Sequence, residues 1–457
     1  MTPLLRRLAV LGVVAVGAVL ACTEDLTAPG RCDRYCPPEK LVVHDTILDT
    51  AITRDSAYGR PIGYVNIPAA PVMLVESLPG PGGRISRAIF RFNPAAALRK
   101  RITTSDTATG PLLQPDSVFV AMRIVRREAQ ASNLTIHLYR LPLTIDSTTT
   151  FSDPAVSDSF ATALLRSVNI DTLLAQPKRR DSLIARDSVH FDSTTGDRLV
   201  VDSVAGQRQY VLILKLDSLA VPFDTTDSGR VALGVRVTAD SFASIALSAS
   251  EQINGQAPSL LWFNRFDSLG TIVDFRQPPR STAGAGGFDG FVFSPGPAPL
   301  DSNLVVGGVP AARSLLRVRL PRAILDSTQI VRATLILVAS DSIRGVPADS
   351  FELFVHPAAV DLGAKSAILF DPLLAPDTIV MHAGPADTVR VEITNILRRW
   401  QADTTLPRTL VLQQGIRVSG FPYEGATLAE ARFYSSRAAL RRPALQLTYM
   451  PRITFAP

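Results

Sequence analysis

The chain has 457 residues, of which 46% are hydrophobic and 19% are charged. This apolar content is enough for packed cores, so the composition excludes a chain that is disordered throughout. Lys and Arg number 47 against 41 Asp and Glu, which gives a formal net charge of +6. The basic residues are scattered along the sequence, so no basic stripe is present and we expect no nucleic-acid partner.

The first residues have the pattern of an export signal. Arg6 and Arg7 precede the uninterrupted apolar run Leu8–Leu20, which is the order of segments in a secretory signal peptide. As a helix this run would span about 20 Å, which is shorter than the ~30 Å hydrocarbon core of a membrane. We therefore predict a signal peptide over residues 1–21 rather than a permanent membrane span.

Cys22 ends the segment Val19–Cys22, which resembles the lipobox of bacterial lipoproteins. The resemblance implies that Cys22 is lipidated and that this N-terminal lipid anchors the protein to a membrane. Thr23 stands where an aspartate would favour retention in the inner membrane, so we expect a bacterial cell-envelope protein in the outer membrane rather than the inner. The alternative is an ordinary signal peptide in which Cys22 has no such role.

Residues 22–40 are predicted to form a short tether, because prolines and a glycine interrupt any regular element there. Cys32 and Cys36 are the remaining cysteines of the three in the chain. In an oxidising compartment we expect them to form a local disulfide. A metal site is the alternative, but it would need further soft ligands nearby.

Beyond residue 40, apolar and polar residues alternate in many short segments. Asn133–Tyr139 and Thr388–Thr394 are clear examples. Strands of this kind bury one face and expose the other, as in antiparallel sandwiches. Asp-Ser pairs such as Asp116–Ser117 and Asp326–Ser327 separate the segments and are typical of turns. The sequence therefore predicts an all-β fold.

The order of these segments occurs twice. Six segments of one half match six of the other in the same order, beginning with Ser86–Phe92 and Ser314–Leu320. We therefore predict two tandem antiparallel β-sandwich domains of jelly-roll type. The first is expected over residues 41–268 and the second over 301–457, with a linker and opening loop over 269–300.

The segments of the second copy suggest a family. They are Arg317–Leu320, Ile330–Leu337, Val391–Trp400, Thr409–Leu412, Phe433–Arg437 and Arg442–Tyr449. In this order they resemble the DNRLRE family of carbohydrate-binding-like jelly rolls, in which a strand leads into a short helical turn that ends in tryptophan. The resemblance implies binding of a carbohydrate rather than its cleavage.

Catalytic signatures are missing from the sequence. It contains no Gly-x-Ser-x-Gly elbow, no His-Glu-x-x-His helix and no Gly-rich phosphate loop, and its five histidines are dispersed. We therefore predict no catalytic residues, no bound cofactor and no transition-metal site. Such sandwiches often hold a structural calcium ion, and oxygen ligands abound here, but no segment marks its place.

Aromatic side chains are the candidate ligand contacts, because their faces can stack on sugar rings. The candidates are Trp400 after a strand, Tyr423 in a Gly- and Pro-rich loop, and Phe288 with Phe291 in the opening loop. For Trp400 a place in the core is the alternative. We expect a non-catalytic protein that binds polysaccharide or extracellular matrix, with a structural or assembly lipoprotein that contacts other proteins as the alternative function.

Overall fold

The computed structural model of the protein describes residues 42–58, 72–78, 83–93, 99–101, 109–112, 117–175, 178–179, 196–204, 207–217, 230–251, 257–268, 271–276, 280–283, 286–294, 303–309, 311–347, 349–369, 378–418, 421–425 and 427–452. Residues 1–41 lie outside this set. The signal peptide, the tether, the lipidation of Cys22 and the disulfide between Cys32 and Cys36 therefore stay predictions.

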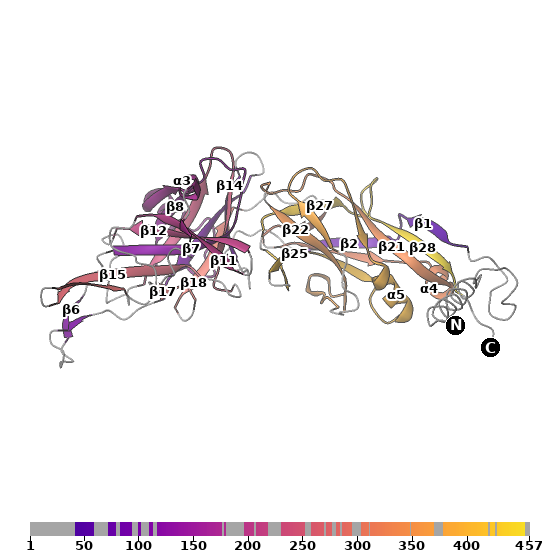
Figure 1. Ribbon diagram of the computed structural model, residues 1–457. Coiled ribbons are helices and arrows are strands. Elements are labelled where there is room, and N and C mark those ends of the chain that lie inside the picture. The colour runs from indigo at the N-terminus through magenta and orange to yellow at the C-terminus, as the bar shows by residue number, and fades with distance from the viewer. Residues whose placement is uncertain are drawn as a thin grey trace, which may run out of the picture.

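The predicted all-β fold is confirmed. The described residues form sheets that are antiparallel except for one short parallel pair, Lys178–Arg179 with Arg198–Val204, together with a few short helices, and the strands gather in two lobes (Figure 1). Lobe 1 comprises the described residues between 72 and 294. Lobe 2 comprises residues 42–58 together with the described residues between 303 and 452.

Lobe 2 is a sandwich of two main sheets. One sheet has the order β1 (His44–Leu48), β28 (Ala444–Pro451), β21 (Thr328–Val338), β24 (Thr388–Glu392). The other has the order β2 (Ile52–Tyr58), β20 (Arg313–Val318), β25 (Thr409–Val418), β22 (Ser350–Pro357), β23 (Thr378–His382), with β26 (Phe421–Tyr423) beside β25. A further pair joins β19 (Asn303–Gly307) to β27 (Glu430–Tyr434). Leu316 and Leu353 from the second sheet pack with Leu335 and Leu447 from the first in one core, as alternating strands require.

Lobe 1 contains one large sheet. Its order is β10 (Lys178–Arg179), β11 (Arg198–Val204), β12 (Gln207–Leu216), β7 (Ser117–Arg127), β14 (Ala243–Ser248), β3 (Val72–Ser77), β4 (Ile85–Arg91), β13 (Ala232–Thr238), β8 (Thr135–Leu141), β9 (Leu164–Asn169). Beside it, β15 (Ser259–Ser268) pairs with β7, β16 (Thr271–Arg276) and β17 (Arg280–Ser281), and β18 (Phe288–Phe293) pairs with β4. Leu212 and Leu138 come from distant strands of the sheet yet share one core cluster, so the sheet folds over on itself.

Short elements complete both lobes. In lobe 1 they are the hairpin of β5 (Arg99–Arg101) with β6 (Thr109–Leu112) and the helices α2 (Pro154–Thr162) and α3 (Ile170–Ala175). In lobe 2 they are α4 (Arg322–Ser327), α5 (Thr394–Ala402) and the 3₁₀ turn η2 (Gly363–Lys365).

The two lobes share one scheme of strand pairing. The set β4–β13–β8 of lobe 1 corresponds to β20–β25–β22 of lobe 2, and β12–β7–β15 corresponds to β24–β21–β28. The pair β3–β14 likewise corresponds to β19–β27. These strands contain the six segments that match in the sequence, so the repeated order reflects a repeated topology.

The composition of the lobes differs from the predicted domain boundaries in two segments, which we call arms. The first arm, residues 42–58, was expected in the first domain, but β1 pairs with β28 and β2 pairs with β20, both in lobe 2. The second arm, the described residues between 271 and 294, was expected to be linker, but β18 pairs with β4 and β16 pairs with β15, all in lobe 1. In Figure 1 the indigo strands β1 and β2 accordingly lie among the orange and yellow strands of lobe 2.

The exchange has a simple physical reason. Without its arm, β20 and β4 would each present an open row of backbone N–H and C=O groups at a sheet edge, which is costly and prone to aggregation. A strand that lies just before a domain in the sequence can satisfy such an edge in either copy, because backbone pairing is largely independent of sequence. Segment order alone therefore could not show which lobe each arm completes.

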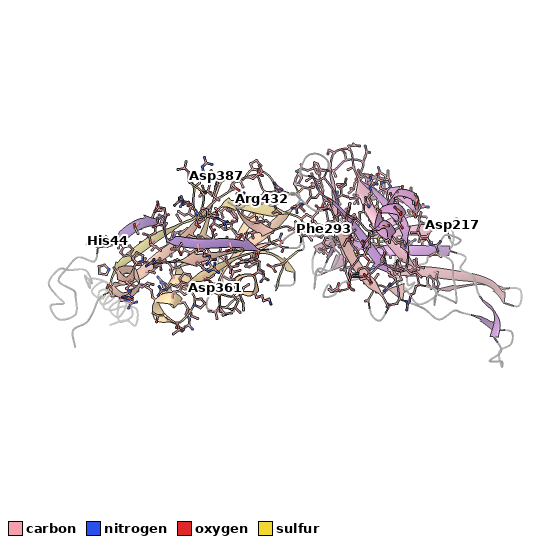
Figure 2. All side chains as sticks on the ribbon, turned by 180° about the vertical axis from the view of Figure 1, so that it is seen from behind. His44, Asp217, Phe293, Asp361, Asp387 and Arg432 are labelled. Carbon is pink, nitrogen blue, oxygen red and sulfur yellow. The ribbon has the colours of Figure 1, made fainter. Side chains whose placement is uncertain are left out.

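We predict that core residues of the two arms stabilise opposite lobes. Ile52 of β2 is buried in the lobe 2 core, and Phe293 of β18 is buried in the lobe 1 core near the junction (Figure 2). We expect Ile52→Ala to cost about 2–5 kcal/mol in lobe 2, and Phe293→Ala about 3–5 kcal/mol in lobe 1. Hydrogen exchange resolved by peptide measures each lobe separately. Faster exchange of residues 117–251 in Ile52→Ala, with lobe 2 unchanged, would refute the exchange of arms.

Candidate functional site

The structure places the predicted aromatic contacts mostly inside the protein. Trp400 of α5 is fully buried in the lobe 2 core, which is the alternative considered for it. Phe291 is buried in the lobe 1 core, and Phe288 is half-buried against the neighbouring cluster around Ile89. The side chain of Tyr423 lies outside the described residues, although its backbone forms part of β26. The three described aromatics thus pack within a lobe and are not brought together at one surface.

Trp400 anchors α5 to the sheets. The helix buries Ile396 and Leu397 together with Trp400 on one face, which is the spacing of a single helix stripe. We predict that Trp400→Ala lowers the free energy of unfolding of lobe 2 by about 3–5 kcal/mol, because it leaves a large cavity. Chemical denaturation followed by circular dichroism measures this loss. A change below about 1 kcal/mol would contradict a core role.

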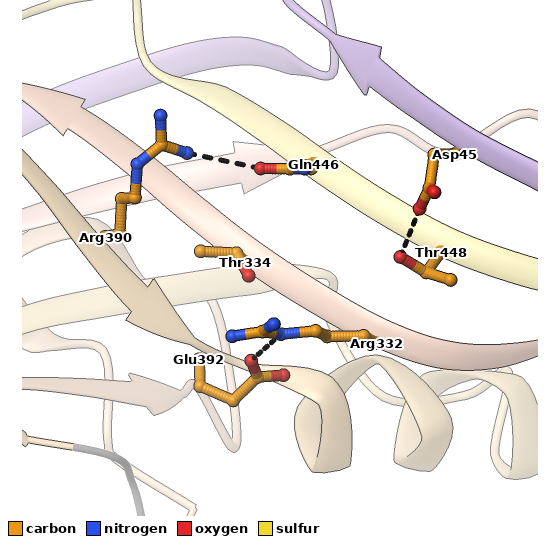
Figure 3. Close-up of a pocket in the computed structure, with 7 residues that line it drawn as sticks. All are labelled: Asp45, Arg332, Thr334, Arg390, Glu392, Gln446 and Thr448. Carbon is orange, nitrogen blue, oxygen red and sulfur yellow. Dashed lines mark hydrogen bonds and ion pairs between the residues drawn. The ribbon is translucent and has the colours of Figure 1, made fainter.

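A polar groove lies on the outer face of the sheet β1–β28–β21–β24. Its cavity volume is about 450 Å³, and Figure 3 shows the side chains that line it. They are Asp45, Arg332, Thr334, Arg390, Glu392, Gln446 and Thr448. Each of the four strands contributes to the groove.

Strand alternation explains why these residues meet. Leu445 and Leu447 of β28 point into the core, so Gln446 and Thr448 between them point outward. The register then aligns outward residues across strands: Gln446 stands opposite Thr334, and Thr334 opposite Glu392. The groove is therefore a property of the pairing of the strands rather than of any one loop.

Hydrogen bonds across the strands hold the groove side chains in place. Arg332 Nε donates to Glu392 Oε2 at 2.8 Å, and Arg390 Nη1 donates to Gln446 Oε1 at 3.2 Å (Figure 3). On the same face, at the opposite edge of the sheet, the Thr448 hydroxyl donates to Asp45. A surface ion pair such as Arg332–Glu392 adds little stability, about 0–1 kcal/mol. The main effect of these bonds is therefore to fix the orientation of the groove side chains.

Charge is balanced in the groove, with two carboxylates and two guanidinium groups. Partial burial raises the pKa of Glu392, but hydrogen bonds from Thr394 and Arg332 outweigh it, and the net pKa lies below the usual value. Glu392 is therefore ionised at neutral pH. Arg390 is bonded to a neutral amide, and no ion pair of Arg390 occurs among the described residues. Its remaining N–H groups can donate to a ligand.

An apolar rim lies beside the polar groove. Ile47 of β1 has 61% of its surface exposed and stands opposite Gln446 in the register. Because side chains two apart share a face of a strand, Ile47 lies on the same face as Asp45. The groove thus offers hydrogen-bonding groups next to an exposed apolar side chain.

The equivalent face of lobe 1 differs in its side chains at the centre of the sheet. Where lobe 2 pairs Thr334 with Gln446, lobe 1 pairs Phe119 with Leu261 at the equivalent position of β7 and β15. Phe119, Leu261 and Ile213 form a buried apolar cluster there. The two copies have therefore diverged at this pair of positions, which is apolar and buried in lobe 1 and polar in lobe 2.

The described histidines support no catalytic arrangement. His137 bonds the hydroxyls of Ser167 and Thr238, at 2.8 and 2.7 Å. His356 is largely buried and stacks on Phe354, and burial together with the nearby Arg313 lowers its pKa to about 4. No group of three or more His, Cys, Asp or Glu suited to a metal ion occurs in the described part of the chain.

No protein-family model matches this chain, and no curated protein is similar enough in sequence to be counted as a relative. The resemblance of the second copy to the DNRLRE family therefore stays a prediction. Within the described residues, no helix is both long enough and apolar enough to cross a membrane.

Sequence reasoning missed the groove, although a signal for it was present. Outward positions of three strands carry polar residues with long or branched side chains, such as Arg390, Glu392 and Gln446. The sequence does not show that these strands are neighbours. Nor does it show that β1, some 400 positions away in the chain, supplies the edge and Asp45.

Proposed function

We propose that this protein is a cell-envelope lipoprotein that binds polysaccharide without cleaving it, and that the lobe 2 groove is its binding site. The observation that carries the proposal is the groove itself, where Arg390, Gln446 and Thr334 project from adjacent strands beside the apolar Ile47. Amide, guanidinium and hydroxyl groups match the hydroxyls of a sugar, and an aliphatic surface matches its C–H face.

The shape of the face also favours a chain-like ligand. The groove crosses all four strands of a sheet and is open to solvent, so a polymer can extend beyond it on either side. Binding needs only hydrogen bonds and contacts in such a site. A cleavage reaction would need a paired acid and base, and Asp45 and Glu392 stand on the two edge strands, with two strands between them.

The alternative is an assembly lipoprotein that contacts other envelope proteins. The observation in its favour is the edge strand β1, which among the described residues pairs with β28 alone; Ile47 in this strand and Val43 just before it are exposed. An exposed apolar sheet edge can pair with a strand of another protein.

We predict that Arg390→Ala and Gln446→Ala each weaken polysaccharide binding at least tenfold, because each removes hydrogen bonds to the ligand, one of them from a charged group. The measurement is affinity electrophoresis of the mature chain in gels that contain a panel of neutral and acidic polysaccharides. Arg322→Ala is the matched control, since Arg322 is an exposed arginine on α4 outside the groove.

Two results would contradict the proposal. One is equal retardation of the control and the groove variants, which would place binding elsewhere. The other is indifference of the wild-type chain to every polysaccharide, together with capture of a reproducible protein partner that depends on Val43 and Ile47; that result would favour assembly.

A further inference from the structure

The two lobes meet at a buried interface. Arg84 of lobe 1 donates from Nη2 to Glu430 Oε2 of lobe 2 at 2.8 Å and from Nη1 to the Leu428 carbonyl at 3.1 Å. Val309 and Leu428 of lobe 2 pack into the lobe 1 core cluster. The interface is therefore both apolar and ionic, and its charged side chains are almost fully removed from water.

A second ionic group crosses the same interface. Glu76 of β3 and Arg126 of β7 belong to lobe 1, and Asp349, just before β22, belongs to lobe 2. Arg126 Nη2 lies 3.0 Å from Asp349 Oδ1 and 3.9 Å from Glu76 Oε1. Glu76 is 2% exposed and Asp349 is 0% exposed. One guanidinium group thus lies within ion-pair distance of two buried carboxyl groups.

Among the described residues, the other groups that face this pair are polar and supply no second positive charge to it. Ser244 of β14 donates to Glu76 Oε1 at 2.8 Å, and the Val346 N–H donates to Asp349 Oδ2 at 3.0 Å. Thr427 also bonds Asp349.

The neighbouring arginines of the interface serve a different carboxylate. Arg84 and Arg432 each donate to Glu430, so that triad holds two guanidinium groups for one carboxylate. The Glu76–Asp349 pair is left with Arg126 as the cation in contact with it.

Two ionised buried carboxylates beside one cation, Arg126, whose side chain is 24% exposed, would leave an uncompensated negative charge, which is costly in a low-dielectric site. One proton held between them removes that charge. Burial and the charge of Asp349 raise the pKa of Glu76 well above its usual value, against the opposing effect of Arg126 and Ser244. Burial likewise raises the pKa of Asp349, although Arg126 opposes it.

We propose that Glu76 and Asp349 form a proton-dependent latch between the two lobes, closed when the pair holds a proton and weakened when both carboxyl groups ionise. The latch joins β3 of lobe 1 to the segment before β22 of lobe 2. It is independent of the groove and of what the groove binds.

The direction of the pH effect follows from linkage. At a pH below the ordinary pKa values of Glu and Asp, these carboxyl groups are protonated whether the lobes are closed or apart, so the contribution of the pair to closure is fully present. Above that pH the separated lobes release the proton while the closed form still holds it. Closure therefore weakens as the pH rises and is weakest once the pH has passed the raised pKa of the pair.

The test measures the distance between the lobes in the full mature chain. Spin labels are attached through Ser157→Cys in lobe 1 and Arg322→Cys in lobe 2, both exposed, in a Cys32→Ser, Cys36→Ser background. We expect a narrow distance distribution at about pH 5 and an increasing fraction of longer distances towards about pH 9. Glu76→Gln keeps a hydrogen-bonding group without the titration, so its distribution is expected to stay narrow at both pH values.

Controls separate the latch from a general effect of pH. Asp326→Asn changes an exposed acid outside the interface and is expected to behave as the wild type does. If Glu76→Gln does not fold, Asp349→Asn tests the same proton from the lobe 2 side. A wild-type distribution that does not change with pH would overturn the proposal, as would a folded Glu76→Gln or Asp349→Asn that opens with the same pH dependence as the wild type.

Discussion

The backbone hydrogen bonds of two exchanged arms are the constraint on which the rest of this structure depends. The first arm, which precedes lobe 1 in the sequence, pairs with edge strands of lobe 2. The second arm, which precedes the first strand of lobe 2 after the insertion, pairs with strands of lobe 1. Open edges are costly for a sandwich. The first arm therefore ties the two copies into one unit, since lobe 2 is completed by strands that precede lobe 1 in the chain.

The same constraint builds the groove. β1 is the first strand of the chain that the structure describes, and it supplies Asp45 and Ile47 to a face whose other residues come from beyond residue 330. If the N-terminus is lipidated as the sequence predicts, the strand that forms one side of the groove is the first described strand after the anchor and the predicted tether. Lobe 2 would then be the lobe nearest the membrane, and lobe 1 would extend from it as an insertion between β2 and β19.

Duplication has left the two lobes with the same topology but different surfaces. Phe119 and Leu261 are buried together in lobe 1, whereas their counterparts Thr334 and Gln446 line the groove in lobe 2. At these positions lobe 1 packs apolar side chains together and lobe 2 presents polar ones. A single site in lobe 2 is therefore the simplest account of how the protein would recognise a ligand.

The sequence predicted the all-β class and the repeated order of strands, because alternation and order are local properties of the chain. It did not predict the partners of β2 and β18, because backbone pairing leaves almost no trace in residue identity. Trp400 was a reasonable aromatic candidate, but the apolar stripe it shares with Ile396 and Leu397 directs it into the core. In the sequence, Arg390 and Gln446 are polar residues at outward positions of separate strands, and only the pairing of the strands shows that they are in contact.

The exchange of arms is most directly tested by a disulfide between the first and last described strands. Asp45 and Thr448 stand opposite each other in the register, with their side chains in contact. Asp45→Cys combined with Thr448→Cys, in a Cys32→Ser, Cys36→Ser background, should form an intramolecular disulfide on oxidation that mass spectrometry assigns to positions 45 and 448. A folded variant in which both thiols stay free, or pair only between different chains, would contradict the placement of the arm in lobe 2.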